Sequence, residues 1–228
     1  MTALILQSRL DSTRLDQKAL LPLGGKPLVL RTMEALKTVK ADVYVLACPV
    51  DSRSTFAPLA KEAGFQIVAG SKENVLERYC DAIRLFNPDR IIRATGDNPF
   101  VFADAADTLH KEASLLGADY SGYAYIPYGA GVESVKAAAL LRAEQEAMEP
   151  RDKEHVCPYL YGNPGLFSLH RPLPPLEWQH PEVKISVDTK EDYEKAQLLY
   201  EALHGKKQDR NPYHGKTVIK KYMALFAP

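Results

Sequence analysis

Short apolar runs alternate with longer segments whose apolar residues recur at helical spacing. The short runs have the length of buried strands and lie at 3–6, 43–47, 65–69 and 90–94. The periodic segments predict helices at 27–39, 56–63, 74–86 and 103–116. Strands that alternate with helices favour βαβ units. The first half of the chain therefore predicts an α/β fold with a mixed, mostly parallel central sheet.

The second half continues this pattern less regularly. An Ala-, Leu- and Glu-rich segment predicts a helix over 136–148, and two further apolar runs predict strands at 166–170 and 183–188, the latter as the last strand of the core. Thr189 and Asp192 fit a capping box that begins a helix ending at 204. A polar tail from 206 to 228 holds a short docking helix over 218–226. We expect one domain over 1–228.

Composition argues against a general nucleic-acid-binding or membrane-binding protein. The 228 residues include 29 basic and 29 acidic side chains, so the charge does not favour general binding to nucleic acid or to a membrane surface. No apolar run approaches the ~18 residues of a membrane span. Cys48, Cys80 and Cys157 are widely separated, which is typical of buried thiols in a reducing compartment. We therefore expect a cytoplasmic protein that binds neither nucleic acid nor membrane.

The candidate chemistry begins directly after the first predicted strand. A loop there combines three cations, Arg9, Arg14 and Lys18, with small hydroxyl residues at 8, 12 and 13. Guanidinium groups offer paired donors to phosphate oxygens, and lysine adds a point charge. The loop therefore indicates a triphosphate site, although an ordinary βα connection with solvated charges remains an alternative.

The order of residues in this loop resembles the nucleotide-binding signature of the sugar-acid cytidylyltransferases, in the branch of spore coat polysaccharide biosynthesis protein F. The matching residues are Gln7, Arg9, Ser12, Thr13, Arg14, Leu15, Lys18, Gly24, Gly25, Lys26 and Pro27. The resemblance implies a Rossmann-like nucleotidyltransferase (GT-A-like) three-layer fold. It also implies nucleotide binding by Gln7, Arg9, Ser12, Thr13, Arg14 and Lys18. The chain departs from the family at Asp11, Asp16 and Gln17, and the two carboxylates added at 11 and 16 are expected to weaken anion binding unless they point outward.

Two later segments resemble the same family at the ends of predicted strands. Residues 70–79 match a loop that lies near the cytosine in the family, which makes Ser71 and Asn74 candidates to recognise the base. The same two residues also suit the start of a helix as caps, and the two roles are compatible. Residues 93–99 match the family motif that carries Thr95, Gly96 and Asp97.

The resemblance places a second carboxylate, Asp188, at the same sheet edge as Asp97. Two carboxylates beside a triphosphate suit Mg²⁺, since this cation takes oxygen ligands from both. We therefore expect Mg²⁺ as cofactor, with Asp97 and Asp188 as its ligands. Structural roles in an Asx turn and at a helix N-terminus are the alternatives for these residues.

The region 120–165 resembles the family's acceptor-binding and dimerisation segment. It contains the matched residues Tyr128 and Glu133, and a further motif that carries His155 and Tyr159. The resemblance implies that these four residues contact the acceptor, with His155 a donor to its carboxylate. A half-buried hairpin with packed tyrosines is the alternative for 120–133. Gly131 replaces an acidic residue that is common in the family.

Together the motifs imply transfer of CMP from CTP to a hydroxyl of a sugar acid, with release of pyrophosphate, by a homodimer. Arg9, Arg14, Lys18 and Asp97 would be the catalytic residues. Two alternatives remain: a nucleotidyltransferase for another nucleotide or acceptor, and a nucleotide-binding protein without activity. The departures at 11, 16, 17 and 131 favour the latter, whereas retention of Lys18, Asp97 and Asp188 argues against it.

Overall fold

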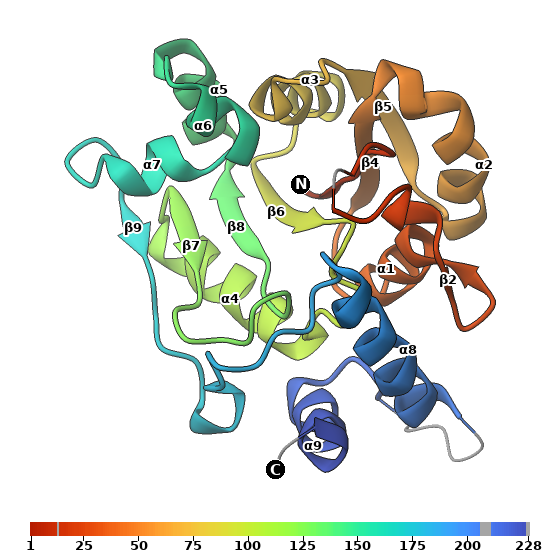
Figure 1. Cartoon of the computed structure of the whole chain (residues 1–228). Coiled ribbons are helices and arrows are strands. Elements are labelled where there is room, and N and C mark those ends of the chain that lie inside the picture. The colour runs from red at the N-terminus through yellow and green to blue at the C-terminus, as the bar shows by residue number, and fades with distance from the viewer. Residues whose placement is uncertain (13, 206–210, 227–228) are drawn as a thin grey trace.

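The computed structural model describes residues 1–12, 14–205 and 211–226. A seven-stranded sheet in the order β5-β4-β1-β6-β8-β7-β9 forms its centre (Figure 1). The strands are β1 (Thr2–Gln7), β4 (Val43–Pro49), β5 (Gln66–Gly70), β6 (Arg90–Thr95), β7 (Tyr120–Gly122), β8 (Glu133–Lys136) and β9 (Leu169–His170). The first four strands in the sheet are mutually parallel, β8 is antiparallel to both of its neighbours, and β9 is parallel to β7. The expected mixed, mostly parallel sheet is confirmed.

Helices cover both faces of the sheet because side chains alternate along the central strand. Leu4 and Leu6 of β1 pack with helices on one face, whereas Ala3 and Ile5 pack with helices on the other. The first group of helices is α1 (Leu28–Leu36), α2 (Arg53–Ala63) and α4 (Ala103–Leu116). The second is α3 (Val75–Phe86), α5 (Ala137–Glu146) and α7 (Pro158–Gly162), with α6 (Pro150–His155) in contact with α3. This is the predicted three-layer arrangement.

A third core packs the C-terminal helices α8 (Lys190–His204) and α9 (Gly215–Phe226) against the end of α4. The prediction of a core strand over 183–188 is wrong. Val183, Ile185 and Val187 are buried in this third core, and the segment forms only an isolated bridge between Tyr128 and Lys184. Its alternating apolar pattern reflects burial against α8 and α9, because its backbone bonds to the loop around Tyr128 and to Asp97 instead of to a strand.

Local signals fix several element boundaries. Thr189 and Asp192 form the predicted reciprocal capping box of α8, and Asn74 caps α3 by accepting from the backbone of Glu77. Gly24 and Gly25 form the turn between β2 (Pro22–Leu23) and β3 (Lys26–Pro27), with φ angles of 55° and 77°. The predicted strand at 166–170 shortens to β9, and the C-terminal helix begins earlier than predicted, at Gly215. Residues 206–210 of the predicted tail lie outside the described residues.

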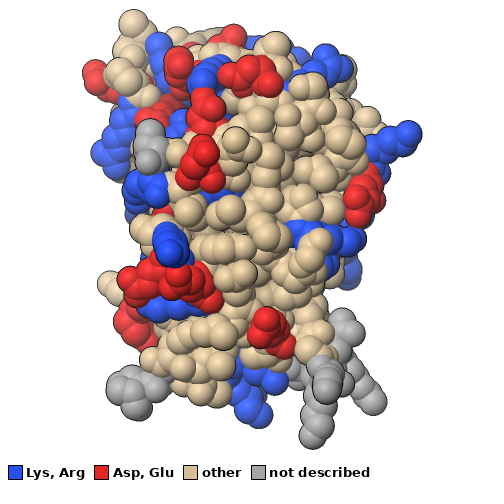
Figure 2. Space-filling view, turned by 45° about the vertical axis from the view of Figure 1, so that its right-hand side comes forward, with Lys and Arg blue, Asp and Glu red and all other residues tan. Residues whose placement is uncertain are grey.

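The surface and the thiols agree with the composition. On the face in Figure 2, basic and acidic side chains are interspersed, as expected for balanced charge. Cys48, Cys80 and Cys157 are all buried and unpaired, as predicted. Among the helices of the described residues, none is long and apolar enough to cross a membrane. The described residues on the face in Figure 2 therefore carry no large patch of one charge.

Candidate active site

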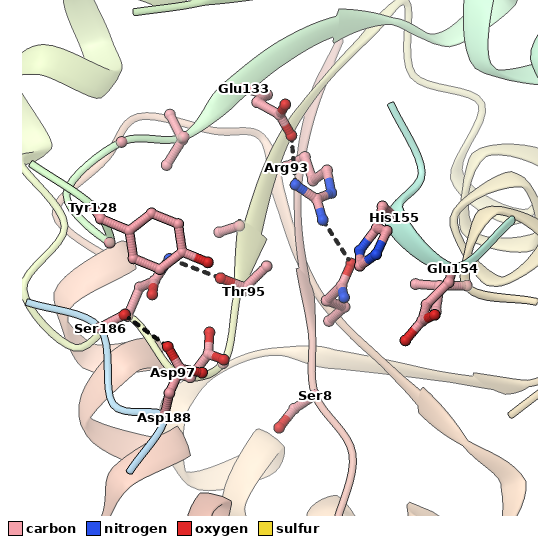
Figure 3. Close-up of a pocket in the computed structure, with 18 of the residues that line it drawn as sticks. Ser8, Arg93, Thr95, Asp97, Tyr128, Glu133, Glu154, His155, Ser186 and Asp188 are labelled. Atoms are coloured by element: carbon pink, nitrogen blue, oxygen red, sulfur yellow. Dashed lines mark hydrogen bonds and ion pairs between the residues drawn. The ribbon is translucent and has the colours of Figure 1, made fainter. Parts of the chain in front are cut away.

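A cavity of about 770 Å³ opens at the carboxyl ends of β1 and β6. Its walls come from the loop after β1, the segment after β6, the loop at 123–132, the residues before α8, and α6. Parallel sheets bind ligands at this edge, because loops from several strands meet there. The cavity has room for a nucleotide and a second small molecule. Figure 3 shows part of its wall.

Lys18 lies between the two carboxylates that were predicted to bind metal. Its Nζ donates to Asp97 Oδ2 at 2.8 Å and to Asp188 Oδ1 at 3.1 Å, and also to the carbonyl of Val187 at 2.9 Å. Figure 3 shows Asp97 and Asp188 side by side on the wall. Three segments far apart in the sequence therefore place one cation and two carboxylates within hydrogen-bonding distance.

Asp188 is held as a carboxylate by several neighbours. Burial alone would raise its pKa, but Lys18 and Lys184 outweigh the burial and lower the pKa below its usual value. The second oxygen of Asp188 accepts from Ser186 Oγ at 3.1 Å and lies 3.2 Å from Lys184 Nζ. Arg14 approaches Asp188 at 3.5 Å and is otherwise exposed. Asp188 thus remains ionised and is already oriented toward the cavity.

The loop after β1 contains three departures from the family pattern, at Asp11, Asp16 and Gln17. Gln17 precedes the short helix η1 (Lys18–Leu20) with a left-handed backbone, φ 44° and ψ 34°, a conformation that glycine adopts without steric cost. Asp11 lines the cavity, but Lys72 pairs with its carboxylate. Asp16 is exposed and does not line the cavity. The carboxylates added at 11 and 16 therefore place little unpaired negative charge in the cavity.

The end of β6 packs closely against the end of β1. The N–H of Gly96 donates to the carbonyl of Gln7 at 2.8 Å, and a Cβ at this position would lie 2.7 Å from Ser8 Oγ. Gly96 is therefore required by the close approach of two strand ends. Thr95 lines the cavity and accepts from Asn98 at 2.7 Å. This close packing fixes Asp97 relative to the loop after β1.

A network of polar side chains from neighbouring strands forms part of the cavity wall. Arg93 pairs with Glu133 and donates to Gln7 Oε1 at 3.3 Å, as Figure 3 shows, while Tyr120 donates to Glu133 at 2.7 Å. Burial alone would lower the pKa of Arg93, but Glu133 outweighs it and raises the pKa. Burial and the nearby Glu133 also raise the pKa of Tyr120. The network links β1, β6, β7 and β8 through side-chain contacts.

Most of the predicted site residues line this cavity. They are Gln7, Arg9, Ser12, Arg14, Lys18, Thr95, Gly96, Asp97, Tyr128, Glu133, His155 and Asp188. Thr13 lies outside the described residues.

Three predicted residues do not line the cavity. Asn74 and Ser71 both serve the start of α3, since Ser71 Oγ accepts from the backbone of Asn74 at 3.1 Å. Tyr159 lies on the opposite side of its helix, where it donates to Glu146 at 3.0 Å and packs against Phe167. The structure therefore places Tyr159 away from the cavity, and it supports the capping alternative for Ser71 and Asn74.

The sequence profile of one family covers nearly the whole chain. The profile described as "Cytidylyltransferase" matches residues 3–221. The chain belongs to this family. It is also 31% identical over 204 residues to spore coat polysaccharide biosynthesis protein SpsF of Bacillus subtilis, over 86% of this chain and 85% of that protein.

More distant relatives cover less of the sequence. A 3-deoxy-manno-octulosonate cytidylyltransferase of Chlorobium phaeovibrioides is 33% identical over 109 residues, which are 46% of this chain and 43% of that protein. The similarity to this group is thus confined to about half of each protein.

Solved structures share the fold at lower identity. A cytidylyltransferase from Leptospira borgpetersenii has a TM-score of 0.87 and 22% identity over 98% of this chain and 94% of that one. A CMP:2-keto-3-deoxy-manno-octonic acid synthetase in complex with CTP has a TM-score of 0.65 and 15% identity over 87% of this chain and 97% of that one. The predicted nucleotidyltransferase fold is confirmed.

Three arginines that line the cavity of this cytidylyltransferase, Arg78, Arg93 and Arg151, were not assigned a role from the sequence. Arg78 is buried on α3, donates to the carbonyl of Ser71 at 2.6 Å, and has a buried Nε without a partner among the described residues. Burial lowers its pKa. Arg93 and Arg151 also line the cavity. The available signal for Arg78 was a cation inside the apolar stripe of a helix, between Val75 and Tyr79.

Proposed function

We propose that this protein transfers CMP from CTP to a hydroxyl of a sugar acid and releases pyrophosphate. One observation supports this reaction above all others: a lysine and two carboxylates from separate loops meet in a cavity large enough for both substrates. The family supports the transfer chemistry. The name of the octulosonate enzymes suggests a sugar acid as acceptor, and the name of SpsF suggests a role in polysaccharide synthesis.

The loop after β1 would hold the triphosphate. Arg9 and Arg14 are about half or more exposed on the cavity wall, and their nearest carboxylates lie at 3.9 Å and 3.5 Å, so both guanidinium groups can turn to phosphate oxygens. Lys18 would neutralise charge that develops on the departing pyrophosphate. Arg78 adds a buried cation without a carboxylate partner among the described residues, which favours an anion or a polar base beside Ser71.

Asp97 and Asp188 fit a divalent cation, which we propose to be Mg²⁺. Mg²⁺ in nucleotide sites is commonly held by one or two carboxylates together with phosphate oxygens and water. The described residues assemble no cage of three or more acidic, histidine or cysteine ligands, and these two carboxylates match the smaller requirement. When bound, the ion would supply positive charge to the α-phosphate. A solved neighbour, Rv0371c of Mycobacterium tuberculosis, is a complex with manganese.

The protein's own contribution is mainly alignment. The acceptor hydroxyl would attack the α-phosphorus on the side opposite to pyrophosphate. The network of Arg93, Glu133 and Gln7 would fix the acceptor relative to the nucleotide, because it is buried and joins both sides of the cavity. Tyr128 and His155 would contact the acceptor from the other walls. The exposed ring of Tyr128 can cover an apolar sugar face.

Pyrophosphate release tests the proposal. Purified protein is supplied with Mg²⁺, each of CTP, UTP, ATP and GTP, and a panel of octulosonic and nonulosonic acids. We expect release with CTP and at least one acid. Release with another nucleotide or only with an acceptor that lacks a carboxylate would indicate the alternative transferase. Absence of both release and nucleotide binding would exclude the enzyme. Sedimentation of the same sample tests the expected homodimer.

A further inference from the structure

We propose that Arg151, together with His155, forms the receptor for the acceptor's carboxylate; this inference rests on the proposed function and specifies its substrate class. Both residues belong to α6 and line the cavity. They are four positions apart, so their side chains emerge on the same side of the helix about one turn apart. A carboxylate can accept two bonds from a guanidinium group and another from an imidazole N–H.

The charges on the cavity wall single out Arg151. Six basic side chains line the cavity, and four of them have a carboxylate within 4 Å: Arg9, Arg14, Lys18 and Arg93. Among the described residues, Arg78 and Arg151 have none. Arg78 lies beside Ser71, on the nucleotide side. Arg151 is therefore the cation on the acceptor side that is available to an incoming anion.

The other residues of α6 do not pair with Arg151. Glu154 faces Arg9, with 3.9 Å between their nearest charged atoms. In Figure 3, Glu154 and His155 lie on the opposite side of the view from Asp97 and Asp188. The ring of His155 has no hydrogen-bond partner among the residues that the structure describes. Neither donor of the proposed receptor has a hydrogen-bond or ion-pair partner among the described residues, and the adjacent carboxylate of Glu154 has Arg9 as its nearest cation.

A strained turn holds His155 in this position. Val156 has φ 73° and ψ −56°, and the N–H of Cys157 donates to the carbonyl of His155 at 2.9 Å. This is the classic γ-turn, which is rare and is unfavourable for a β-branched residue. Val156 and Cys157 are buried in the core against α3 and α5, which keeps the turn in place. Strain of this kind concentrates at binding sites, where the surrounding packing maintains it.

The test compares Arg151→Gln with Lys153→Gln. Lys153 has the same charge and lies on the same helix, but it does not line the cavity. With the acid that is most active in the panel, R151Q should raise the KM for the acid by about 10-fold or more, since a charged bidentate contact is lost. The KM for CTP should remain within about twofold in both variants, and K153Q should match the wild type. Arg151→Lys should restore only part of the affinity, because lysine lacks the forked donors.

A second comparison distinguishes a carboxylate receptor from a general effect on packing. Wild type should favour the acid over its carboxamide analogue, and R151Q should lose most of this preference. Equal effects of R151Q on the acid and the carboxamide, or identical behaviour of R151Q and K153Q, would overturn the inference. So would a preferred acceptor that has no carboxylate.

Binding without turnover separates this inference from the proposed function. Saturation-transfer NMR with 3-deoxy-manno-octulosonate and N-acetylneuraminate, in the presence of CTP and without Mg²⁺, reports acceptor binding directly. Signal in wild type and K153Q that disappears in R151Q supports the receptor even if no product forms, in which case only the proposed reaction fails. If product forms and R151Q binds the acid as well as the wild type does, the proposed reaction stands and the receptor is refuted. Absence of signal for every acid in wild type also refutes it.

Discussion

Lys18 occupies the position between Asp97 and Asp188 that a divalent cation would take. Because its Nζ lies 2.8 Å and 3.1 Å from the two carboxylates, metal must compete with the ammonium when no nucleotide is bound. We predict that Lys18→Met binds Mn²⁺ more tightly than the wild type in the absence of nucleotide, while its affinity for CTP falls. In the wild type, phosphate oxygens would draw Lys18 away, so metal and nucleotide should bind together.

The magnitude follows from the geometry. At these distances, and with an effective dielectric constant of about 20, each ion pair contributes between about 5 and 6 kcal/mol of Coulomb energy before desolvation. Removing one partner of a buried pair typically costs 3–5 kcal/mol, as a rough range, since the remaining charge is left unpaired. Asp97 is 27% exposed, so the expected loss of unfolding free energy lies near the lower end, about 3 kcal/mol. Loss of one charged contact to phosphate should weaken CTP binding by about 10- to 100-fold.

Urea unfolding with and without Mg²⁺ measures the competition. Circular dichroism reports the whole fold, and fluorescence reports Trp178, the single tryptophan. Without metal, K18M should unfold at lower urea than the wild type. Saturating Mg²⁺ should stabilise K18M by about 2–3 kcal/mol at 100 times its dissociation constant, but should scarcely change the wild type. Electron paramagnetic resonance with Mn²⁺ gives the metal affinity directly.

The matched control is Lys184→Met. Lys184 approaches Asp188 at 3.2 Å and Asp192 at 2.6 Å but has no contact with Asp97. This variant should lose stability without gaining a metal site, because Lys18 still bridges the two carboxylates. If K18M binds Mn²⁺ no more tightly than the wild type, the competition does not exist. Equal metal-dependent stabilisation of K18M and K184M would refute the specific role of Lys18.

Three further predictions follow from other parts of the structure. Gly24→Ala should lower the unfolding free energy by about 3 kcal/mol, because its Cβ would lie 2.0 Å from the ring of Tyr200. Gly25→Ala has no atom within 4 Å of its Cβ, so it should lower the unfolding free energy by only about 1 kcal/mol, from its positive φ. Equal losses for the two variants in urea titrations would contradict this account. Burial and the nearby Arg90 lower the pKa of His110 below 6.5, so the unfolded state binds more protons than the folded state. The unfolding free energy should therefore fall as the pH drops below about 6.5, by at most about 1.4 kcal/mol per pH unit. His110→Gln should remove part of this pH dependence, and the remainder should come from His204, whose pKa is also lowered by burial. Arg78→Gln should weaken CTP binding about tenfold in calorimetry at unchanged or higher stability, because it removes a buried cation without a carboxylate partner among the described residues; a large loss of stability would make Arg78 structural.

Several features of this cytidylyltransferase could be read from the sequence because they depend on local order. Hydrophobic periodicity predicted the parallel strands and most helices, and capping chemistry predicted the start of α8. The family motifs identified Lys18, Asp97 and Asp188, since each lies in a short segment whose residue order resembles that of the family. Residues close in the chain carry such signals directly, without knowledge of distant contacts.

Other features were decided only by tertiary structure. The segment 183–188 has the alternation of a strand, yet it packs on α8 and α9 because those helices supply the apolar surface that buries it. Tyr159 matches a motif but points to Glu146, since the orientation of a short helix depends on its packing partners. Arg78 and Arg151 became candidates only once the ion pairs of their neighbours were known. A sequence states which charges exist; the fold decides which of them already have partners and which remain available to a ligand.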